Sequence, residues 1–394
     1  MKKDGKQKKK NSGQWIGMVI FLLIGAACGM LFMTYMNHTG ENGADKPGMI
    51  PSLVLMLVCL YGAMLVQIIL HEAGHLVFGL MTGYGFSSFR IFNVMLVKED
   101  EHIRIRHMSV AGTGGQCLMT PPDLKDGKIP VLLYSFGGSL MNLLVGAVCF
   151  GFSFACRPYS FPWMLLMVFA VIGLAYALMN GLPVKMGQVN NDGRNAMDVS
   201  GNETAMRAYW LQMKMNELVS KGIRLKDMPD EWFIVPGDED MRNGIVATVG
   251  VMACNRLMDQ HRFEEADDLM RRLLSQDNGI VGIYRGFLLC DRMYVEMITE
   301  NRTEVIESMR TKEQLNLMKA MGSYPSIART EYVYALLMQR DREAAETALK
   351  WFEKHAKTYP YPSEIGAERE LMAIADEVYE NRLGKDAGEE EDIG

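Results

Sequence analysis

One stretch decides the fold of this chain, and its sequence is Ile68-Ile69-Leu70-His71-Glu72-Ala73-Gly74-His75-Leu76-Val77-Phe78. Ionisable side chains stand here inside an apolar run that is long enough to cross a membrane. His71 and His75 are four residues apart, so an α-helix places both on one face, one turn from each other. An ionisable residue within a membrane span is costly and marks a functional site by default. The cluster therefore predicts a site within the bilayer.

The spacing of the two histidines suits a metal ion. Two neutral imidazoles one helical turn apart can bind zinc, and Glu72, beside the first of them, can act as a base toward water at the metal. The pattern His-Glu-x-x-His also occurs by chance on packed helices, where neighbouring groups satisfy the histidines. A bilayer disfavours that alternative, because polar groups without a use are expensive there.

Charge divides the chain into two parts. Residues 1–185 hold 15 Lys and Arg against 9 Asp and Glu, whereas residues 186–394 hold 26 against 38. The first part also contains nearly all the long apolar runs. We therefore expect a membrane domain followed by an acidic soluble domain. The only dense lysine run is at the N-terminal tip, so the sequence predicts no groove for nucleic acid.

The apolar runs predict four transmembrane helices. The first is expected at 15–36, after a basic N-terminus (1–14) that the charge rule places in the cytoplasm. This front end differs from a secretory signal peptide, because its apolar run is longer and no convincing cleavage site follows. The other helices are expected at about 50–82, 129–154 and 161–182. With four spans the C-terminus returns to the cytoplasm, and the histidine pair lies nearer the cytoplasmic face.

Between the second and third spans the pattern changes to that of strands. Gly83 and Gly85 end the helix, and apolar residues then alternate as far as Ile105 around the polar turn Lys98-Glu99-Asp100-Glu101. This pattern predicts a β-hairpin at about 86–110, followed by a loop that contains Gly and Pro.

Residues 203–385 are helical in pattern and contain no further membrane run. The segments around Ala266 and Ala345 each look like the second helix of a tetratricopeptide-type hairpin, and the two alanines are 79 residues apart, about two repeat periods. We expect three degenerate helical hairpins here, and a disordered acidic tail at 386–394. The predicted fold is thus an all-α polytopic membrane protein with a small β-hairpin and a soluble α-helical repeat domain.

A zinc ion that keeps one position open for water needs a third protein ligand. Asp192 follows the end of the fourth span and is the preferred candidate, although an Asp-Gly turn would also explain it. Asp198 lies shortly after. The remaining candidates lie on the predicted hairpin or in a polar loop, where exposure or a turn explains them: His102, His107, Asp123 and Asp126.

Three motifs follow one another between residues 50 and 195. They are His71-Glu72-Ala73-Gly74-His75, then Gly137-Gly138-Ser139-Leu140-Met141-Asn142, then Asn180-x-x-Pro183 with Asp192-Gly193. Together they resemble the site-2 protease family of intramembrane zinc metalloproteases, over about a third of the chain. The resemblance implies a three-helix catalytic core at about 50–195, with a membrane-associated β-hairpin between its first and second helices.

The resemblance also implies roles for seven residues: His71, His75 and Asp192 as zinc ligands, Glu72 as the base, Asn180 beside the oxyanion, and Gly138 and Asn142 along the substrate path. In the family the Asp-Gly pair follows the proline by a few residues. Here eight residues separate Pro183 from Asp192, and Asn191 precedes the aspartate.

The expected function is cleavage of a peptide bond within or near the transmembrane segment of a membrane protein or small membrane peptide, as in regulated intramembrane proteolysis, with one Zn²⁺ per chain. The expected surroundings are the lipid bilayer of a bacterial plasma membrane, with both termini in the cytoplasm and a cytoplasmic protein on the helical repeats. The alternative is a catalytically inactive membrane-anchored scaffold whose repeats bind a cytoplasmic protein. A solute transporter is disfavoured, because one polar cluster makes a poor two-sided pathway.

Overall fold

The computed structural model describes residues 12–39, 48–99, 102–110, 113–183, 185–186 and 189–391. These residues form two compact units. The membrane unit combines the chain up to Thr82 with Pro130–Ser200, and the second unit combines Gly83–Ile129 with the chain from Gly201 onward. Most of the predicted basic N-terminus (1–14) lies outside the described residues.

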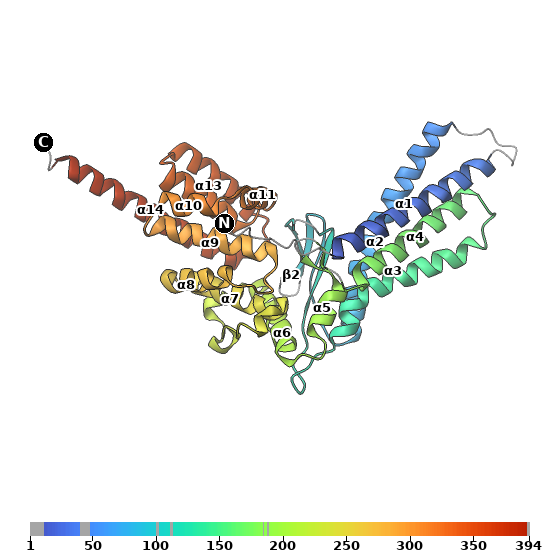
Figure 1. Cartoon of the computed structure of the whole chain (residues 1–394), viewed down its shortest axis with the longest axis horizontal. Coiled ribbons are helices and arrows are strands. Elements are labelled where there is room, and N and C mark those ends of the chain that lie inside the picture. The colour runs from blue at the N-terminus through green and yellow to red at the C-terminus, as the bar shows by residue number, and fades with distance from the viewer. Residues whose placement is uncertain are drawn as a thin grey trace, which may run out of the picture. The chain divides into compact units, whose positions relative to one another are not determined.

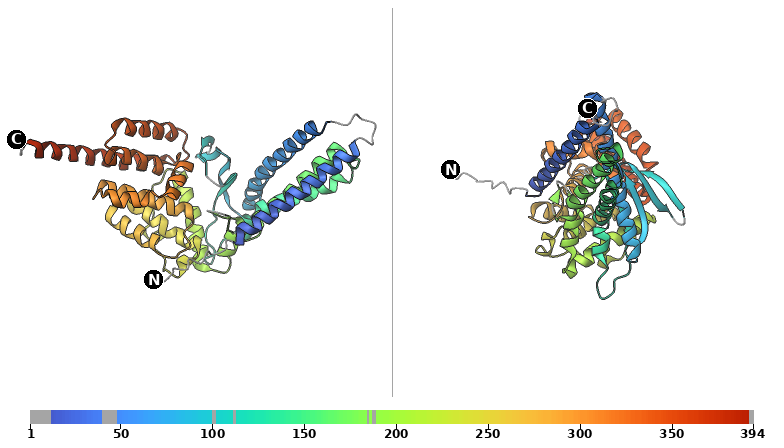
Figure 2. Two further views of the ribbon diagram at one scale, coloured as in Figure 1. Left: turned by 45° about the horizontal axis from the view of Figure 1, so that its top comes forward. Right: turned by 90° about the vertical axis from the view of Figure 1, so that its right-hand side faces the viewer.

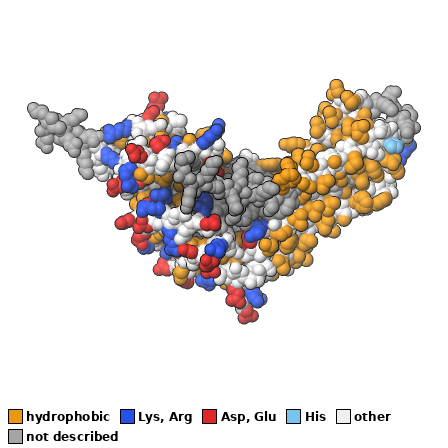
Figure 3. All heavy atoms as spheres, in the orientation of Figure 1, with side chains coloured by type: hydrophobic (Ala, Val, Ile, Leu, Met, Phe, Trp, Pro, Cys, Tyr) orange, Lys and Arg blue, Asp and Glu red, His pale blue; other side chains and the backbone are white. Residues whose placement is uncertain are grey.

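Four long apolar helices make up most of the membrane unit: α1 (Ser12–Thr39), α2 (Met49–Met81), α3 (Val131–Ser153) and α4 (Phe161–Gly181) (Figure 1). All four are long and apolar enough to cross a membrane, which confirms the predicted spans in length and composition. Their outward side chains are largely apolar, and Figure 3 shows a nearly continuous hydrophobic surface over them. Such a surface suits contact with lipid rather than water.

Helices α2 and α3 touch through glycine backbones. A Cβ atom added to Gly74 would lie 2.3 Å from the carbonyl oxygen of Gly137, and one added to Gly137 would lie 2.7 Å from the carbonyl oxygen of Gly74. Small residues at a helix crossing let membrane helices approach closely. Because Gly74 lies between the two histidines in sequence, this crossing brings α3 directly beside them.

Two short strands lie in the segment between Pro183 and Asp192. Strand β5 (Lys185–Met186) pairs antiparallel with β6 (Val189–Asn190), and helix α5 (Asp192–Val199) begins two residues later. A two-stranded ribbon leaves and returns at the same point. The extra residues therefore do not carry Asp192 away from the end of α4.

A four-stranded antiparallel sheet stands where the hairpin at 86–110 was predicted. Its strands are β1 (Gly85–Ile91), β2 (Val94–Glu99), β3 (His102–His107) and β4 (Gly115–Thr120), in the order β3-β2-β1-β4. The predicted hairpin has two strands fewer than the observed sheet, for two reasons. The apolar alternation continues through a tight turn in which Phe92 has a φ of 53°, a conformation rare for a bulky residue. Strand β4 lies in the segment predicted to be a loop.

The sheet belongs to the same compact unit as the C-terminal helices, although the sequence grouped it with the membrane core. Met95, Val97 and Met108 are buried and share one hydrophobic core with those helices. The Trp210 indole donates a hydrogen bond to the Pro122 carbonyl at 3.0 Å, and the His107 amide donates to the Thr358 carbonyl at 2.9 Å.

The rest of the second unit is helical: α6 (Glu203–Ser220), α7 (Gly244–Asp259), α8 (Phe263–Ser275), α9 (Gly282–Ile298), α10 (Thr303–Met309), α11 (Lys312–Ala320), α12 (Pro325–Val333), α13 (Arg342–Ala356) and α14 (Pro362–Glu391). Successive helices such as α7 and α8, and α12 and α13, pack on each other across short connections. Ala266 and Ala345 are both buried in this core. Assignment of the pairs to tetratricopeptide repeats stays a prediction.

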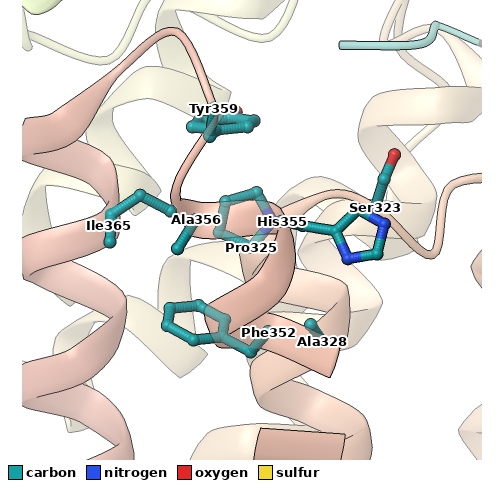
Figure 4. A pocket seen from close by; sticks show the side chains of 8 residues that line it. All are labelled: Ser323, Pro325, Ala328, Phe352, His355, Ala356, Tyr359 and Ile365. Carbon is teal, nitrogen blue, oxygen red and sulfur yellow. The ribbon is translucent and has the colours of Figure 1, made fainter. Parts of the chain in front are cut away.

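Helices α12, α13 and α14 meet around a small hollow (Figure 4). Mostly apolar side chains line it, among them Ala328, Phe352 and Ile365. Helix α14 then continues as one long helix (Figure 2). It includes residues 386–391, so the structure is helical in that part of the acidic tail, where disorder was predicted. Residues 392–394 lie outside the described part.

Candidate metal centre and active site

Helix α2 carries both histidines on the face that is turned toward α3. His71 and His75 are each only 7% exposed, and their Nε2 atoms lie 3.2 Å apart. This is the geometry that the spacing of four predicts, since one helical turn separates the two side chains. Two imidazoles buried at this position point their outer nitrogens at a common centre.

Asp192, the first residue of α5, reaches the same centre. Its Oδ2 atom lies 3.0 Å from Nε2 of His71 and 3.3 Å from Nε2 of His75. Among the described residues, these three are the group of metal-binding side chains whose ligand atoms converge.

Asn191 holds Asp192 in place, and sequence reasoning missed this residue. Its Nδ2 atom donates to the carbonyls of Met179 and Leu182, at 2.7 and 2.5 Å, where α4 ends. Its Oδ1 accepts a hydrogen bond from the Arg194 amide at 3.0 Å and so caps the start of α5. One side chain thus satisfies two helix ends. Asn before Asp-Gly was noted as a departure from the family pattern, whereas it was also a helix N-cap signal.

Gly193 lets α5 begin against the end of α4. A Cβ atom there would lie 2.2 Å from the carbonyl oxygen of Gly181. The Asp-Gly pair therefore has a structural reason as well as a chemical one, because only glycine permits this approach.

The inner nitrogens of both histidines are occupied by acceptors. His71 Nδ1 lies 2.7 Å from Oδ1 of Asn142, and His75 Nδ1 lies 2.8 Å from the carbonyl oxygen of Tyr134. An amide oxygen and a carbonyl oxygen can only accept, so each Nδ1 carries the hydrogen of the neutral imidazole. Each Nε2 then presents a lone pair.

The centre therefore consists of two imidazole lone pairs and a carboxylate oxygen, with no hydrogen among them. Acceptors at 3.0, 3.2 and 3.3 Å repel one another unless a proton or a cation joins them. Ligands about 2.0–2.2 Å from a tetrahedral zinc ion are themselves about 3.3 Å apart. The donor set, its spacing and the hydrogen-bonded inner nitrogens all fit a three-ligand zinc site with one open position.

Gly138 and Glu72 lie beside this centre. Glu72 follows His71 on α2 and is 8% exposed. A Cβ atom on Gly138 would lie 2.4–2.6 Å from three atoms of the His71 ring. The absence of a side chain at Gly138 is what leaves room for that ligand. The roles of Glu72 as base and of Gly138 along a substrate path stay predictions.

Asn142, Asn180 and Ser139 complete the surroundings. Asn142 is fully buried and contacts a ligand, while its role on a substrate path stays a prediction. The Asn180 amide donates to the Tyr176 carbonyl at 3.1 Å, and its role at the oxyanion also stays a prediction. Sequence reasoning gave no role to Ser139, a buried residue whose Oγ has no hydrogen-bond partner among the described residues.

The other candidate ligands lie elsewhere. His102 and His107 are exposed residues of the second unit. Asp123 and Asp126 are exposed as well, and Asp126 has a φ of 50° in a turn. Asp198 forms an ion pair with Arg194 at 2.8 Å.

Comparison with known proteins finds a family match for part of the chain. Residues 49–185 match a family model described as Peptidase M50B-like, which belongs to the site-2 protease family of zinc-dependent metallopeptidases. The match includes the histidine pair and ends before Asp192. No curated protein and no solved structure matches the chain.

Proposed function

Because residues 49–185 belong to the site-2 protease family, we propose that this chain is an intramembrane zinc metalloendopeptidase. Its substrate would be a membrane protein or small membrane peptide, cut within or near its transmembrane segment as in regulated intramembrane proteolysis. One observation carries the proposal: His71, His75 and Asp192 turn three acceptor atoms toward one point, 3.0–3.3 Å apart, in an apolar helical bundle. Such a cluster is costly in a membrane protein unless a proton or a cation joins the three acceptors, and the ligand set favours a zinc ion there.

The residues of the chain divide the work of hydrolysis. Zinc, when bound, supplies an activated nucleophile at neutral pH and a positive charge for the transition state. Glu72 would accept a proton from the attacking water and return it to the leaving amine. Asn180 would donate a hydrogen bond to the developing oxyanion.

The membrane setting restricts the substrate. A helix engages its carbonyl groups in hydrogen bonds, so a transmembrane substrate must unwind before attack. The proposed topology places both termini in the cytoplasm of a bacterial cell and the centre nearer the cytoplasmic face, following the positive-inside rule.

The variant Glu72→Gln tests the catalytic assignment. The full chain, wild type or variant, is reconstituted in liposomes with a panel of single-span membrane peptides, and products are identified by mass spectrometry. We expect the variant to keep about one zinc per chain and to lose cleavage, because glutamine cannot accept the proton. His75→Ala serves as the control that loses zinc. Cleavage by Glu72→Gln at the wild-type rate would refute the role of Glu72.

Metal analysis of the purified protein separates the enzyme from the inactive scaffold. About one zinc per chain supports the peptidase, and a protein without zinc supports the scaffold. Binding of a cytoplasmic protein to the second unit stays a prediction under either function.

A further inference from the structure

Three side chains form a line of hydrogen bonds inside the membrane unit. The Asn142 amide on α3 donates both hydrogens to one residue of α2, Gln67, at 2.8 Å to its backbone oxygen and 2.6 Å to its Oε1. Its Oδ1 atom faces Nδ1 of His71 at 2.7 Å. Gln67 itself donates from Nε2 to the carbonyl of Phe169 on α4, at 3.2 Å. Gln67 and Asn142 are both completely buried.

The direction of these bonds fixes the hydrogen on His71. A primary amide can present either its oxygen or its NH₂ group to an imidazole. Since both acceptors on Gln67 require the NH₂ group of Asn142, the oxygen must face His71, which then carries its hydrogen on Nδ1. A reversed amide would place NH₂ against Nδ1, move the hydrogen to Nε2 and remove the lone pair from the centre.

The two histidines differ in this respect. His75 donates to the backbone carbonyl of Tyr134, which can only accept. His71 alone depends on a group that can turn around. The orientation of that group depends in turn on two acceptors of Gln67, its backbone oxygen and its Oε1. The side-chain acceptor is itself oriented by the bond from Nε2 to Phe169.

We propose that Gln67 is a positioning residue for the metal centre: it holds the Asn142 amide so that Nε2 of His71 stays a ligand. The inference rests on the zinc site of the proposed function. Gln67 acts through Asn142 and touches neither the metal ligand atoms nor a substrate. It also explains why an uncharged but strongly polar side chain lies one turn before His71 in a membrane helix.

Zinc affinity of the purified full chain in detergent tests the proposal, measured by competition with a chromogenic chelator. Gln67→Met has a similar volume and removes the side-chain acceptor of Asn142, while the backbone oxygen stays in place. We expect it to weaken zinc binding by about tenfold, at the lower end of the effect of losing a partner of a metal ligand. Gln67→Glu should bind zinc almost as the wild type does, because a protonated acid can accept from Asn142 and donate to Phe169. Visible absorption of bound Co²⁺ should follow the same order, with a higher Co²⁺ concentration needed to saturate it in Gln67→Met and a nearly wild-type titration in Gln67→Glu.

A double variant separates positioning from general packing. If Gln67 acts through Asn142, Gln67→Met should have no further effect on zinc affinity in the Asn142→Leu background. Additive losses, or wild-type zinc affinity in Gln67→Met with only a lower melting temperature, would overturn the proposal. A wild-type protein that binds no zinc would instead refute the proposed function itself.

Discussion

At the residue scale, the site depends on where side chains are absent as much as on where they are present. His71 lies between Gly138, which leaves space for its ring, and Asn142, which holds its inner nitrogen. The ring cannot move away from a new neighbour without breaking that hydrogen bond. Both glycines of the Gly137-Gly138 motif are therefore explained by close contacts. Gly137 lies against the backbone of Gly74, and Gly138 lies against the ring of His71.

Gly138→Ala should disturb the metal centre more than the helix. The new methyl group would lie 2.4 Å from the ring of His71, so we expect zinc affinity to fall by at least about tenfold. Gly151→Ala, on the same helix with nothing within 4 Å of the new methyl group, is the matched control and should bind zinc normally. Equal zinc dissociation constants for the two variants would contradict this account.

At the element scale, the end of α4 and the start of α5 are held together by hydrogen bonds from one side chain. Strands β5 and β6 pair between Pro183 and Asp192, and the Asn191 side chain then bonds to both helix ends. This is why the long spacing, which weakened the family pattern, leaves Asp192 beside the two histidines.

Asn191→Ala should remove the hydrogen bonds that connect the end of α4 to the start of α5. Loss of a helix cap costs about 1 kcal/mol of stability, and zinc affinity should fall because Asp192 loses its anchor. Asn202→Ala removes an N-cap of the same kind from α6 in the second unit. We expect it to cost similar stability in denaturant unfolding and to leave zinc affinity unchanged. Normal zinc binding by Asn191→Ala would show that Asp192 is held by other contacts.

The sheet shows how one pattern can mislead at this scale. The alternation that predicted strands includes Leu96 and Ile105, which pair across β2 and β3 and are 37% and 64% exposed. The neighbours of Leu96 along β2 are Met95 and Val97. They point to the other face of the sheet, pack against the helices and are fully buried. Both faces are apolar, so period-two alternation identified strands but could not show which face is covered.

At the scale of the whole molecule, the second unit joins two distant parts of the chain. Residues 83–129 are inserted between two membrane helices, yet they share a core with residues beyond 201. Removal of the C-terminal helices would therefore expose Met95, Val97 and Met108 to solvent. It would also remove any partner-binding surface that those helices carry.

A chain that ends at about residue 200 should misfold locally in the sheet. We expect limited proteolysis to cut within 83–129 in this truncated chain and to spare that segment in the full chain, because its apolar core is exposed. Loss of cleavage activity in the truncated chain would then reflect a damaged sheet and would not demonstrate substrate recruitment by the helices. A protease-resistant sheet in the truncated chain would show that it folds without them.

The sequence by itself determined the features that depend on neighbours along one helix. Length and polarity of the apolar runs predict four spans, and a spacing of four places His71 beside His75. The motif that ends in Asp192-Gly193 adds the third predicted ligand. Tertiary structure decided the rest. Three features arise from contacts between helices: the position of Asp192 beside the histidines, the cap by Asn191 and the contact of Gln67 with Asn142. Close packing at Gly74 and Gly137 sets the distance between α2 and α3. Pairing of β5 with β6 keeps Asp192 near the end of α4. One helix, α2, is enough to place the two histidines side by side. The complete centre also needs α3, which contacts their rings, and α5, which supplies Asp192.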